Sequence, residues 1–310
     1  MNPRILLIGK NGQVGSELAL MLPRLGELVA LDRQQLDLSK PDDIRRAIRE
    51  AGPQFIVNAA AYTAVDQAEK DEVAARLINT DAPAVMAEEA KKIDSVLVHY
   101  STDYVFDGTK NSPYVESDPT NPVNVYGRTK LAGEQAIRDS GAAHLIFRTA
   151  WVYATSGRNF LLTMLRLGTQ REELRIVRDQ IGAPTWSREI ARATTEVLAQ
   201  LRTGTGEAVS RRGVSGTYHL TAAGETSWHE FATAIFEEAS RMPQNIPWFA
   251  KGTSGNPFIC RRVVPVTTAE FPTPARRPAN SVLSNAHFLR TFGIRLADWR
   301  SQLHSAFTAD

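Results

Sequence analysis

Short apolar runs alternate with amphipathic stretches along the first half of the chain. Runs rich in Val, Ile, Leu and Phe predict β-strands at residues 4–8, 28–31, 55–58, 95–100 and 145–148. Helical periodicity between them predicts helices at residues 39–50, 66–79, 81–92 and 126–139, with Ser39 as the cap of the first and Pro41 in its first turn. This alternation is typical of an α/β fold built on a doubly wound parallel sheet.

The pattern loosens after about residue 150. It predicts helices near 159–168 and 188–202, a polar stretch at 203–216, a strand at 217–221 and an irregular proline-rich loop at 264–278. We therefore expect a first domain at residues 1–150 and a smaller lobe at 151–310, of which residues 186–235 pack back on the sheet of the first domain.

A glycine-rich turn directly follows the first predicted strand. Gly9, Gly12 and Gly15 precede an amphipathic run that begins at Val14. Glycines in this setting let the backbone approach a pyrophosphate at a helix N-terminus. Asp32 follows the second strand, where a carboxylate would accept hydrogen bonds from ribose hydroxyls. The turn predicts a Rossmann dinucleotide site; the alternative for Asp32 is an ordinary residue of a strand-end turn.

Tyr126 and Lys130 lie four residues apart in a predicted helix. Because positions i and i+4 share a helix face, the Lys130 ammonium can lie beside the Tyr126 phenol. A nearby cation favours phenolate and lowers the pKa of a tyrosine toward the operating pH, where general acid–base transfer is most effective. The same spacing fits a surface lysine beside a half-buried tyrosine, but the upstream glycine turn favours a proton donor.

Composition and charge exclude several classes of protein. The chain has 310 residues, 43% of them hydrophobic, which is enough for a large core, and its net charge of +2 is spread without a basic stripe for nucleic acid. Cys260 is the sole cysteine, so no internal disulfide is possible, and the first apolar run is too short for a signal peptide or membrane span. The six histidines lack zinc-site spacing. We expect a cytoplasmic protein with no resident metal, no nucleic-acid partner and no membrane partner.

Motifs in a fixed order carry a family resemblance. They occupy residues 9–15, 31–33, 36–38, 57–69, 100–108, 124–134, 148–153, 179–185 and 277–281. On these residues the chain resembles the extended short-chain dehydrogenases/reductases, and within them the dTDP-4-dehydrorhamnose reductases. The resemblance covers nearly the whole length and implies a Rossmann domain followed by a sugar-nucleotide lobe.

NADPH or NADH is the cofactor that the resemblance implies. It puts Ala61, Tyr62 and Thr63 beside the nicotinamide half and Asp37 and Leu38 near the adenine, although residues 58–66 would also suit a tightly packed strand-to-helix turn. Together with the glycine motif, the expected cofactor-binding residues are Gly9, Asn11, Gly12, Gln13, Val14, Gly15, Asp32, Arg33, Asp37, Leu38, Ala61, Tyr62, Thr63, Tyr100, Tyr126 and Lys130.

The resemblance also assigns catalytic and substrate positions. Thr102 takes the place of the family's catalytic hydroxyl beside Tyr126 and Lys130. Related dehydratases place Asp and then Glu after the threonine, so Tyr104 at the second position favours simple reduction. Trp151 would give a flat wall for a deoxysugar, or else belong to the core. The expected substrate-binding residues are Thr102, Asp103, Tyr104, Trp151, Asn159, Gln180, Pro184 and Arg277.

The implied activity is NAD(P)H-dependent reduction of the C4 ketone of dTDP-4-dehydro-β-L-rhamnose. Two alternatives remain open: another nucleotide-sugar reductase or epimerase, and a non-catalytic regulatory subunit like that of methionine adenosyltransferase. Some members of the family join two subunits through Mg²⁺ held by glutamates. Glu17 matches one such position, but Arg188 and Arg300 stand where the other carboxylates would be. We expect these arginines to pair with Glu17 or Glu189, and the protein to be a monomer or a metal-free homodimer.

Overall fold

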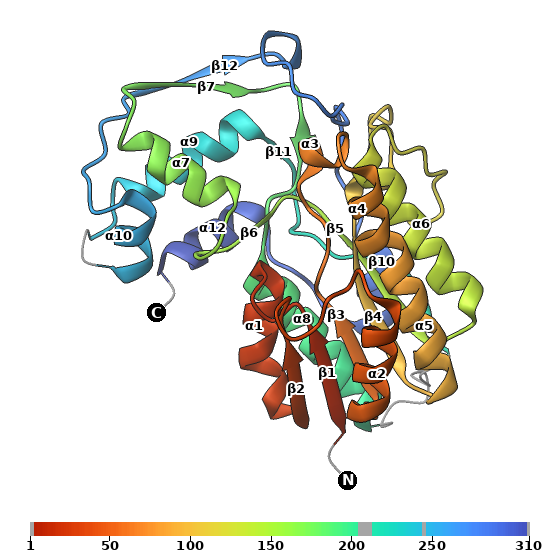
Figure 1. Ribbon diagram of the computed structural model, residues 1–310. Coiled ribbons are helices and arrows are strands. Elements are labelled where there is room, and N and C mark those ends of the chain that lie inside the picture. Colours follow the sequence, from red (N-terminus) through yellow and green to blue (C-terminus); the bar gives the residue numbers. More distant parts are fainter. Residues whose placement is uncertain (1–2, 204–212, 244–245, 309–310) are drawn as a thin grey trace.

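A six-stranded parallel sheet forms the centre of the protein in the computed structural model, which describes residues 3–203, 213–243 and 246–308 (Figure 1). The strand order is β10-β5-β4-β3-β1-β2, and every neighbouring pair is parallel. The bounds are Arg4–Ile8 (β1), Glu27–Leu31 (β2), Phe55–Asn58 (β3), Val96–Thr102 (β4), His144–Thr149 (β5) and Gly216–His219 (β10). This confirms the predicted parallel α/β fold.

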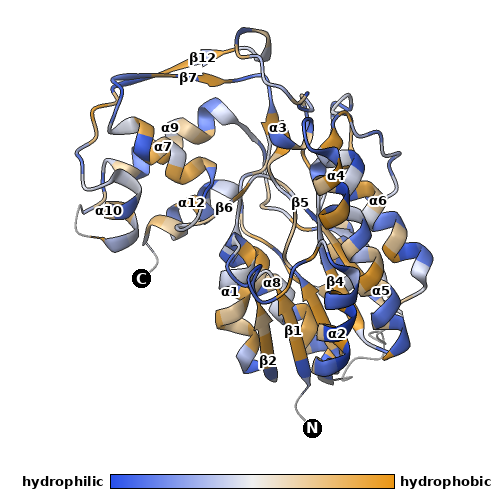
Figure 2. Cartoon of the chain, in the orientation of Figure 1, coloured by the Kyte–Doolittle hydropathy of each residue, from blue (hydrophilic) through white to orange (hydrophobic). Residues whose placement is uncertain are grey.

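Helices cover both faces of this sheet. One face packs on α1 (Gln13–Met21), α8 (Ser187–Thr203) and α11 (Ala286–Phe292), and the other on α2 (Pro41–Ala51), α5 (Ala82–Lys92) and α6 (Val125–Ser140). Alternate residues of a strand point to opposite faces, so Ile5 and Leu7 join the first core and Leu6 and Ile8 the second. Burial on both faces explains why the strands are continuous apolar runs (Figure 2).

The strand order reverses between β1 and β3. From β1 the chain goes outward to β2 on one side and then to β3, β4 and β5 on the other. In open α/β sheets, ligands bind at the carboxyl ends of the strands beside such a switch point. The loops that follow β1 and β3 are therefore the expected walls of a binding site.

The second lobe is an aromatic-rich cluster of helices. Its core joins Tyr153, Phe231, Phe249 and Phe307, and its strands β7 and β12 form a parallel ribbon at the top of Figure 1. The elements are β6 (Val152–Tyr153), α7 (Phe160–Gly168), β7 (Glu173–Val177), β8 (Ile181–Gly182), β9 (Thr185–Trp186), β11 (Thr226–Ser227), α9 (Trp228–Ala239), α10 (Pro247–Thr253), β12 (Arg262–Val266), η4 (Thr268–Glu270) and α12 (Trp299–Thr308). Between the lobe's elements, α8 returns to pack on α1, and β10 joins the main sheet beside β5.

Three element predictions were wrong. The helix predicted at 66–79 is instead α3 (Val65–Ala68), α4 (Glu72–Arg76) and a π-helical segment η2 (Leu77–Asp81) that leads into α5. Lys40, not Ser39, precedes α2, because the Ser39 hydroxyl donates to Asp37 Oδ1 at 2.7 Å. The proline-rich loop predicted at 264–278 begins with strand β12. Most of the polar stretch at 203–216 lies outside the described residues.

Candidate active site

The glycine turn after β1 packs directly against the segment after β3. Gly9 has a φ of 88°, and a Cβ atom on it would lie 2.8 Å from the backbone nitrogen of Ala60. A Cβ on Gly15 would lie 2.0 Å from the Gly9 carbonyl oxygen. Only glycine fits both positions, because any side chain would push the turn off α1 or off the Ala60 backbone. The turn therefore brings bare backbone to the switch point.

The start of α1 is suited to an anion. Gly12 is the N-cap residue and has no side chain to accept a hydrogen bond, and the first turn reads Gln-Val-Gly-Ser, which is uncharged. The first N–H groups of a helix have no partner within the helix, and the helix dipole favours negative charge there. The nearest atom to a Cβ on Gly12 would be the Gly9 oxygen at 3.3 Å. These residues fit the pyrophosphate of a dinucleotide.

Asp32 lies where β2 ends and faces the glycine turn. Asn11 Nδ2 donates to its Oδ2 at 3.2 Å, and Lys10 Nζ lies 3.5 Å from the same oxygen. Burial would raise the pKa of Asp32, but hydrogen bonds from the Gln34 and Gln35 backbone and the charge of Lys10 lower it overall. The result is an ionised carboxylate with a cation beside it at the position expected for the adenosine ribose.

Thr102, Asp103 and Tyr126 form one hydrogen-bonded unit at the carboxyl end of β4. Thr102 Oγ1 donates to Asp103 Oδ1 at 2.9 Å, accepts from the Tyr104 backbone at 3.1 Å, and forms a hydrogen bond with the Tyr126 phenol. The Tyr104 and Tyr126 rings meet edge to face, with centroids 5.8 Å apart. The structure thus brings together these four residues, which the sequence placed in two separate motifs.

Burial sets the proton affinities of this unit. It raises the pKa of Tyr126 to about 12, against the hydrogen bond from Thr102, and it raises the pKa of Asp103 to about 6. We expected Lys130 to lower the pKa of Tyr126. The structure corrects that expectation, because removal of water from the phenol outweighs the other interactions. Tyr126 therefore holds its proton firmly near neutral pH.

The Lys130 amine is held against β4 rather than toward the phenol. Its Nζ donates to the Tyr100 carbonyl at 2.6 Å and lies 3.0 Å from His99 Nε2, whose other ring nitrogen is 3.1 Å from Asn58 Nδ2. The side chain is 1% exposed. Burial lowers the pKa of Lys130 to about 7, with the charge of Glu134 acting in the opposite direction.

Arg277 is bound to a carboxylate of this chain. Its Nη1 and Nη2 each donate to Asp66 at 2.8 Å, and Nη1 also donates to Thr273 and to the Ala275 carbonyl. The predicted bidentate contact with a substrate phosphate is therefore replaced by a contact with Asp66. Arg277 instead acts on Tyr104, with which it forms a hydrogen bond. It helps to fix the wall of the site opposite Tyr126.

Trp151 packs between two parts of the second lobe. Its ring stacks on Trp228 with centroids 3.5 Å apart, and a Cβ on Gly182 would lie 2.4 Å from the ring. Its φ of 47° lies in the left-handed region, which side chains of this size rarely adopt. These contacts give Trp151 a packing role on two sides, and its contact with a sugar stays a prediction.

Three other predicted substrate residues are engaged within the lobe. Asn159 caps α7, accepting from the Leu162 backbone at 3.1 Å and donating to Ala154 and Ser156 carbonyls. Gln180 donates to Thr268 at 3.1 Å, and Pro184 is buried. Asn159 has both of its amide atoms in use, which is a physical reason against substrate binding by its side chain.

The remaining cofactor positions divide into two groups. Ala61, Tyr62 and Thr63 lie in the segment that follows β3 and meets the glycine turn, and Asn79 holds Tyr62 through both its backbone N–H and its carbonyl. The side chains of Leu38 and Tyr100 are buried in the sheet cores, where the Tyr100 hydroxyl bonds Thr194 at 2.7 Å. Tyr100 thus serves the site through its carbonyl, which corrects the expected cofactor contact of its ring. Gln13 and Val14 begin α1, while Asp37 binds Ser39 and Arg33 is exposed.

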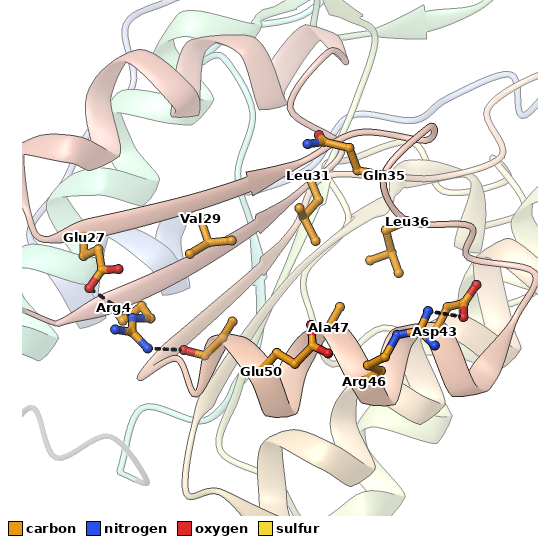
Figure 3. Close-up of a pocket in the computed structure, with 11 residues that line it drawn as sticks. Arg4, Glu27, Val29, Leu31, Gln35, Leu36, Asp43, Arg46, Ala47 and Glu50 are labelled. Carbon is orange, nitrogen blue, oxygen red and sulfur yellow. Dashed lines mark hydrogen bonds and ion pairs between the residues drawn. The ribbon is translucent and has the colours of Figure 1, made fainter.

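A surface groove of about 420 Å³ runs along the outer edge of β2 (Figure 3). Its lining comes from β1, β2, α2 and the segment between β2 and α2, and ion pairs between Arg4 and Glu27 and between Arg46 and Asp43 lie along it. Only its Gln35 end approaches Asp32. We place the active site at the carboxyl edge instead, because the proton-transfer groups converge there.

Carboxylates and arginines pair where metal ligands were considered. Arg188 Nε lies 3.3 Å from Glu17, as expected, and Arg300 Nη1 lies 3.1 Å from Glu237. Among the described residues, no group of three or more His, Cys, Asp or Glu side chains is placed to hold a metal ion. Within the same residues, no helix is long and apolar enough to cross a membrane.

Sequence reasoning missed four residues that shape the site: Lys10, Asn58, Asn79 and His99. Lys10 lies inside the glycine motif, so its position was a usable signal. The other three meet the site from β3, η2 and β4, and each contact spans 17 residues or more of sequence. A pattern along one segment does not encode such pairings.

The parallel sheet, its switch point and the glycine turn beside a Tyr–Lys helix define an oxidoreductase of the extended short-chain dehydrogenase/reductase class. The model of the family described as RmlD substrate binding domain matches residues 3–310, and the chain belongs to that family.

Named relatives are similar along nearly the whole chain. The dTDP-4-dehydrorhamnose reductase of Burkholderia thailandensis is 51% identical, covering 96% of this chain and 95% of the relative. The enzyme of the same name from Escherichia coli K12 is 43% identical, covering 96% and 94%. The structure of dTDP-4-dehydrorhamnose reductase from Bacillus anthracis in complex with NADP covers 100% of both chains at 33% identity, with a TM-score of 0.85.

Proposed function

We propose that this protein is an NAD(P)H-dependent reductase that converts dTDP-4-dehydro-β-L-rhamnose to dTDP-β-L-rhamnose. The observation that carries the proposal is the Thr102–Tyr126 hydrogen bond, placed at the carboxyl end of β4 beside a glycine turn that fits a dinucleotide. Similarity to reductases of that name along the whole chain supports the choice of substrate. The reactants, a nicotinamide cofactor and a nucleotide sugar, lead us to assign the reaction to the cytoplasm.

The glycine turn, the start of α1 and Asp32 would hold the cofactor. Backbone N–H groups at Gly12 and after it face the pyrophosphate, and the Asp32 carboxylate accepts from ribose hydroxyls. When bound, the reduced cofactor supplies the hydride for the C4 carbonyl carbon. The small residues at 59–61 leave room for the nicotinamide half beside the turn.

Tyr126 and Thr102 would act on the carbonyl oxygen. As negative charge develops there, Tyr126 donates its phenolic proton to that oxygen, and Thr102 binds the same oxygen and holds it within transfer distance. A phenol with a raised pKa keeps this proton until the oxygen becomes basic enough to take it. Lys130, when charged, stabilises the phenolate that remains.

Turnover with the purified protein tests the proposal. We expect nicotinamide absorbance to fall when NADPH and dTDP-4-dehydro-β-L-rhamnose are both present, with dTDP-L-rhamnose identified by chromatography against a standard. The ketone dTDP-4-dehydro-6-deoxy-D-glucose serves as the control sugar. Faster reduction of the control would assign another nucleotide-sugar reductase, whereas NADPH binding without oxidation by either sugar would favour a non-catalytic subunit.

A further inference from the structure

A chain of buried hydrogen bonds leads from the backbone of Ala60 to the Lys130 amine. Ala60 N–H donates to Asn58 Oδ1 at 3.1 Å, Asn58 Nδ2 lies 3.1 Å from His99 Nδ1, and His99 Nε2 lies 3.0 Å from Lys130 Nζ. Asn58 and His99 are 0% exposed. Neither role assigned above, cofactor binding or proton donation, uses His99.

The direction of every bond in this chain is set at its start. A backbone N–H can only donate, so the Ala60 contact fixes Oδ1 of Asn58 as the acceptor and leaves Nδ2 to donate. His99 Nδ1 must then accept. The pKa of His99 is well below its ordinary value because of burial and the charge of Lys130, so the ring is neutral. Its one proton therefore lies on Nε2.

That proton points at the Lys130 amine. An ammonium group has three donors and no acceptor, so it cannot receive the Nε2–H of His99, whereas a neutral amine can. The amine then accepts from His99 and donates to the Tyr100 carbonyl at 2.6 Å. The opposite tautomer would set a His99 Nδ1–H against the Asn58 amide donor. Only the neutral amine satisfies the whole chain.

The charges around Lys130 agree with this arrangement. Glu134 lies one turn further along α6, but it accepts two hydrogen bonds from Arg148 of β5, at 2.9 and 2.7 Å, and others from Ser101 of β4 and Arg138 of α6. Its charge is therefore largely compensated. β3 presents the neutral Asn58 and η2 the neutral Asn79, and Asp103 of η3 (Asp103–Val105) is bound by Thr102.

We propose that His99 is a positioning residue that holds the Lys130 amine neutral and against β4. This inference deepens the proposed function, on which its catalytic meaning rests. When the amine takes a proton from solvent, its lone pair is used and the hydrogen bond from His99 is lost. The ammonium is then repelled by Nε2–H and released to stabilise the Tyr126 phenolate. Charging and release of the lysine are one event.

Two substitutions remove the Nε2–H donor in different ways. His99→Gln gives a neutral side chain whose amide oxygen can accept from an ammonium. Asn58→Asp keeps the shape but replaces the amide donor with a carboxylate, so Nδ1 of His99 carries the proton and Nε2 accepts. Both should raise the pKa of Lys130 by about 1 or more, because they favour its charged form. His219→Gln is the matched control, since His219 is also buried and its pKa is lowered to about 3, but it bonds Tyr114.

The readout is the titration of Lys130 in protein prepared without cofactor or substrate. Lysines labelled with carbon-13 at Cε are followed by NMR against pH, and the Lys130 signal is the one lost in Lys130→Met. We expect it to titrate near pH 7 in the parent and His219→Gln proteins, and higher in the two test variants. Titration near the ordinary lysine value of about 10.4 in the parent, or an unchanged value in His99→Gln, overturns the proposal. A rise in Asn58→Asp alone also overturns it, because the added negative charge would suffice.

The pH profile of turnover gives a second readout. The ammonium is lost as pH rises through the pKa of Lys130, so kcat/KM of the parent should fall through pH 7, and His99→Gln should move that fall to higher pH. An unmoved profile beside a raised pKa contradicts the catalytic meaning of His99. If the chain turns over neither sugar, the proposed function fails while the NMR titration still decides the state of Lys130.

Discussion

The hydroxyl of Thr102 is the point at which the reacting groups of this site meet. It gives its proton to Asp103 at 2.9 Å and so presents its oxygen to the Tyr126 phenol. With the Asp103 pKa raised to about 6, its carboxylate is mostly ionised at neutral pH and keeps Thr102 in this orientation. The unit is thus preorganised for a proton donor that points away from Asp103 and toward a substrate oxygen.

Replacement of Tyr126 by Phe tests the role of the phenolic proton. The change keeps the ring and its edge contact with Tyr104, so cofactor binding should be largely retained. We expect kcat to fall by roughly 10²- to 10⁴-fold, the usual contribution of general acid catalysis. Stopped-flow measurement of nicotinamide absorbance gives the rate. Tyr218→Phe, which alters a core tyrosine bonded to Val214, is the control, and near-normal turnover of Tyr126→Phe would exclude the role.

Arg33 and Lys10 decide how the site treats a 2′-phosphate. Asp32 favours an unphosphorylated ribose, but Lys10 lies 3.5 Å from it and Arg33 is adjacent and exposed, so we expect both NADH and NADPH to be used. Arg33→Ala should weaken NADPH binding by about 10-fold and NADH binding less, because a charge-assisted hydrogen bond is lost only with the phosphate. Lys10→Ala should add to this effect.

Calorimetric titration of both cofactors checks this prediction. Arg46→Ala is a suitable control, since that arginine is also exposed but is bound to Asp43 on α2. Equal loss for both cofactors would mean that Arg33 does not reach the 2′-position.

Among elements, α6 shows how close packing fixes the catalytic helix. A Cβ on Gly133 would lie 2.1 Å from the carbonyl oxygen of Asn79 in the π-helical segment η2. Asn79 in turn holds the backbone of Tyr62 and bonds Thr129 of α6 at 3.2 Å. The contact between these two elements therefore sets the position of Tyr126 and Lys130 relative to the segment that follows β3.

Gly133→Ala should destabilise the protein although alanine is the better helix former. In an exposed helix the change would stabilise by roughly 0.5–1 kcal/mol. Here the methyl group must displace a backbone oxygen, and we expect a loss of about 1–3 kcal/mol. Urea unfolding measures the difference, with Gln135→Ala on the exposed face of α6 as the control. An unfolding midpoint above that of the parent would contradict the packing argument.

The strands could be predicted within one or two residues because burial on both faces makes each an unbroken apolar run. The helix predicted at 66–79 could not, since its break depends on the contact between Asn79 and Gly133, 54 residues apart. One local signal was available: Asp71 caps α4 by accepting from the Ala74 backbone at 3.2 Å. At the site, spacing placed Tyr126 and Lys130 on one helix, but the direction of the amine depends on His99 in another strand.

At the scale of the whole molecule, the order of the strands explains why distant motifs meet. Parallel strands end at the same edge, so the turn after β1, the segment after β3 and the end of β4 converge at one side of the sheet. The second lobe returns to this edge through residues 275–281, where Ala275 and Arg277 bind Asp66 and Ser281 bonds Ile181. The sequence indicated the parallel sheet, whereas these returns depend on contacts between its two ends.

Ion pairs on α1, α8 and α12 lead us to predict an enzyme that works without Mg²⁺. Mg²⁺ requires oxygen ligands in near-octahedral geometry, but Arg188 occupies Glu17, Arg192 occupies Glu189 at 2.9 Å, and Arg300 pairs with Glu237. A divalent cation would have to displace these guanidinium groups and would be repelled by them. We expect kcat/KM and the mass measured by light scattering to be unchanged by EDTA or by added Mg²⁺. Loss of activity or halving of the mass on chelation, with recovery on adding Mg²⁺, would show that carboxylates of this chain bind the ion after all.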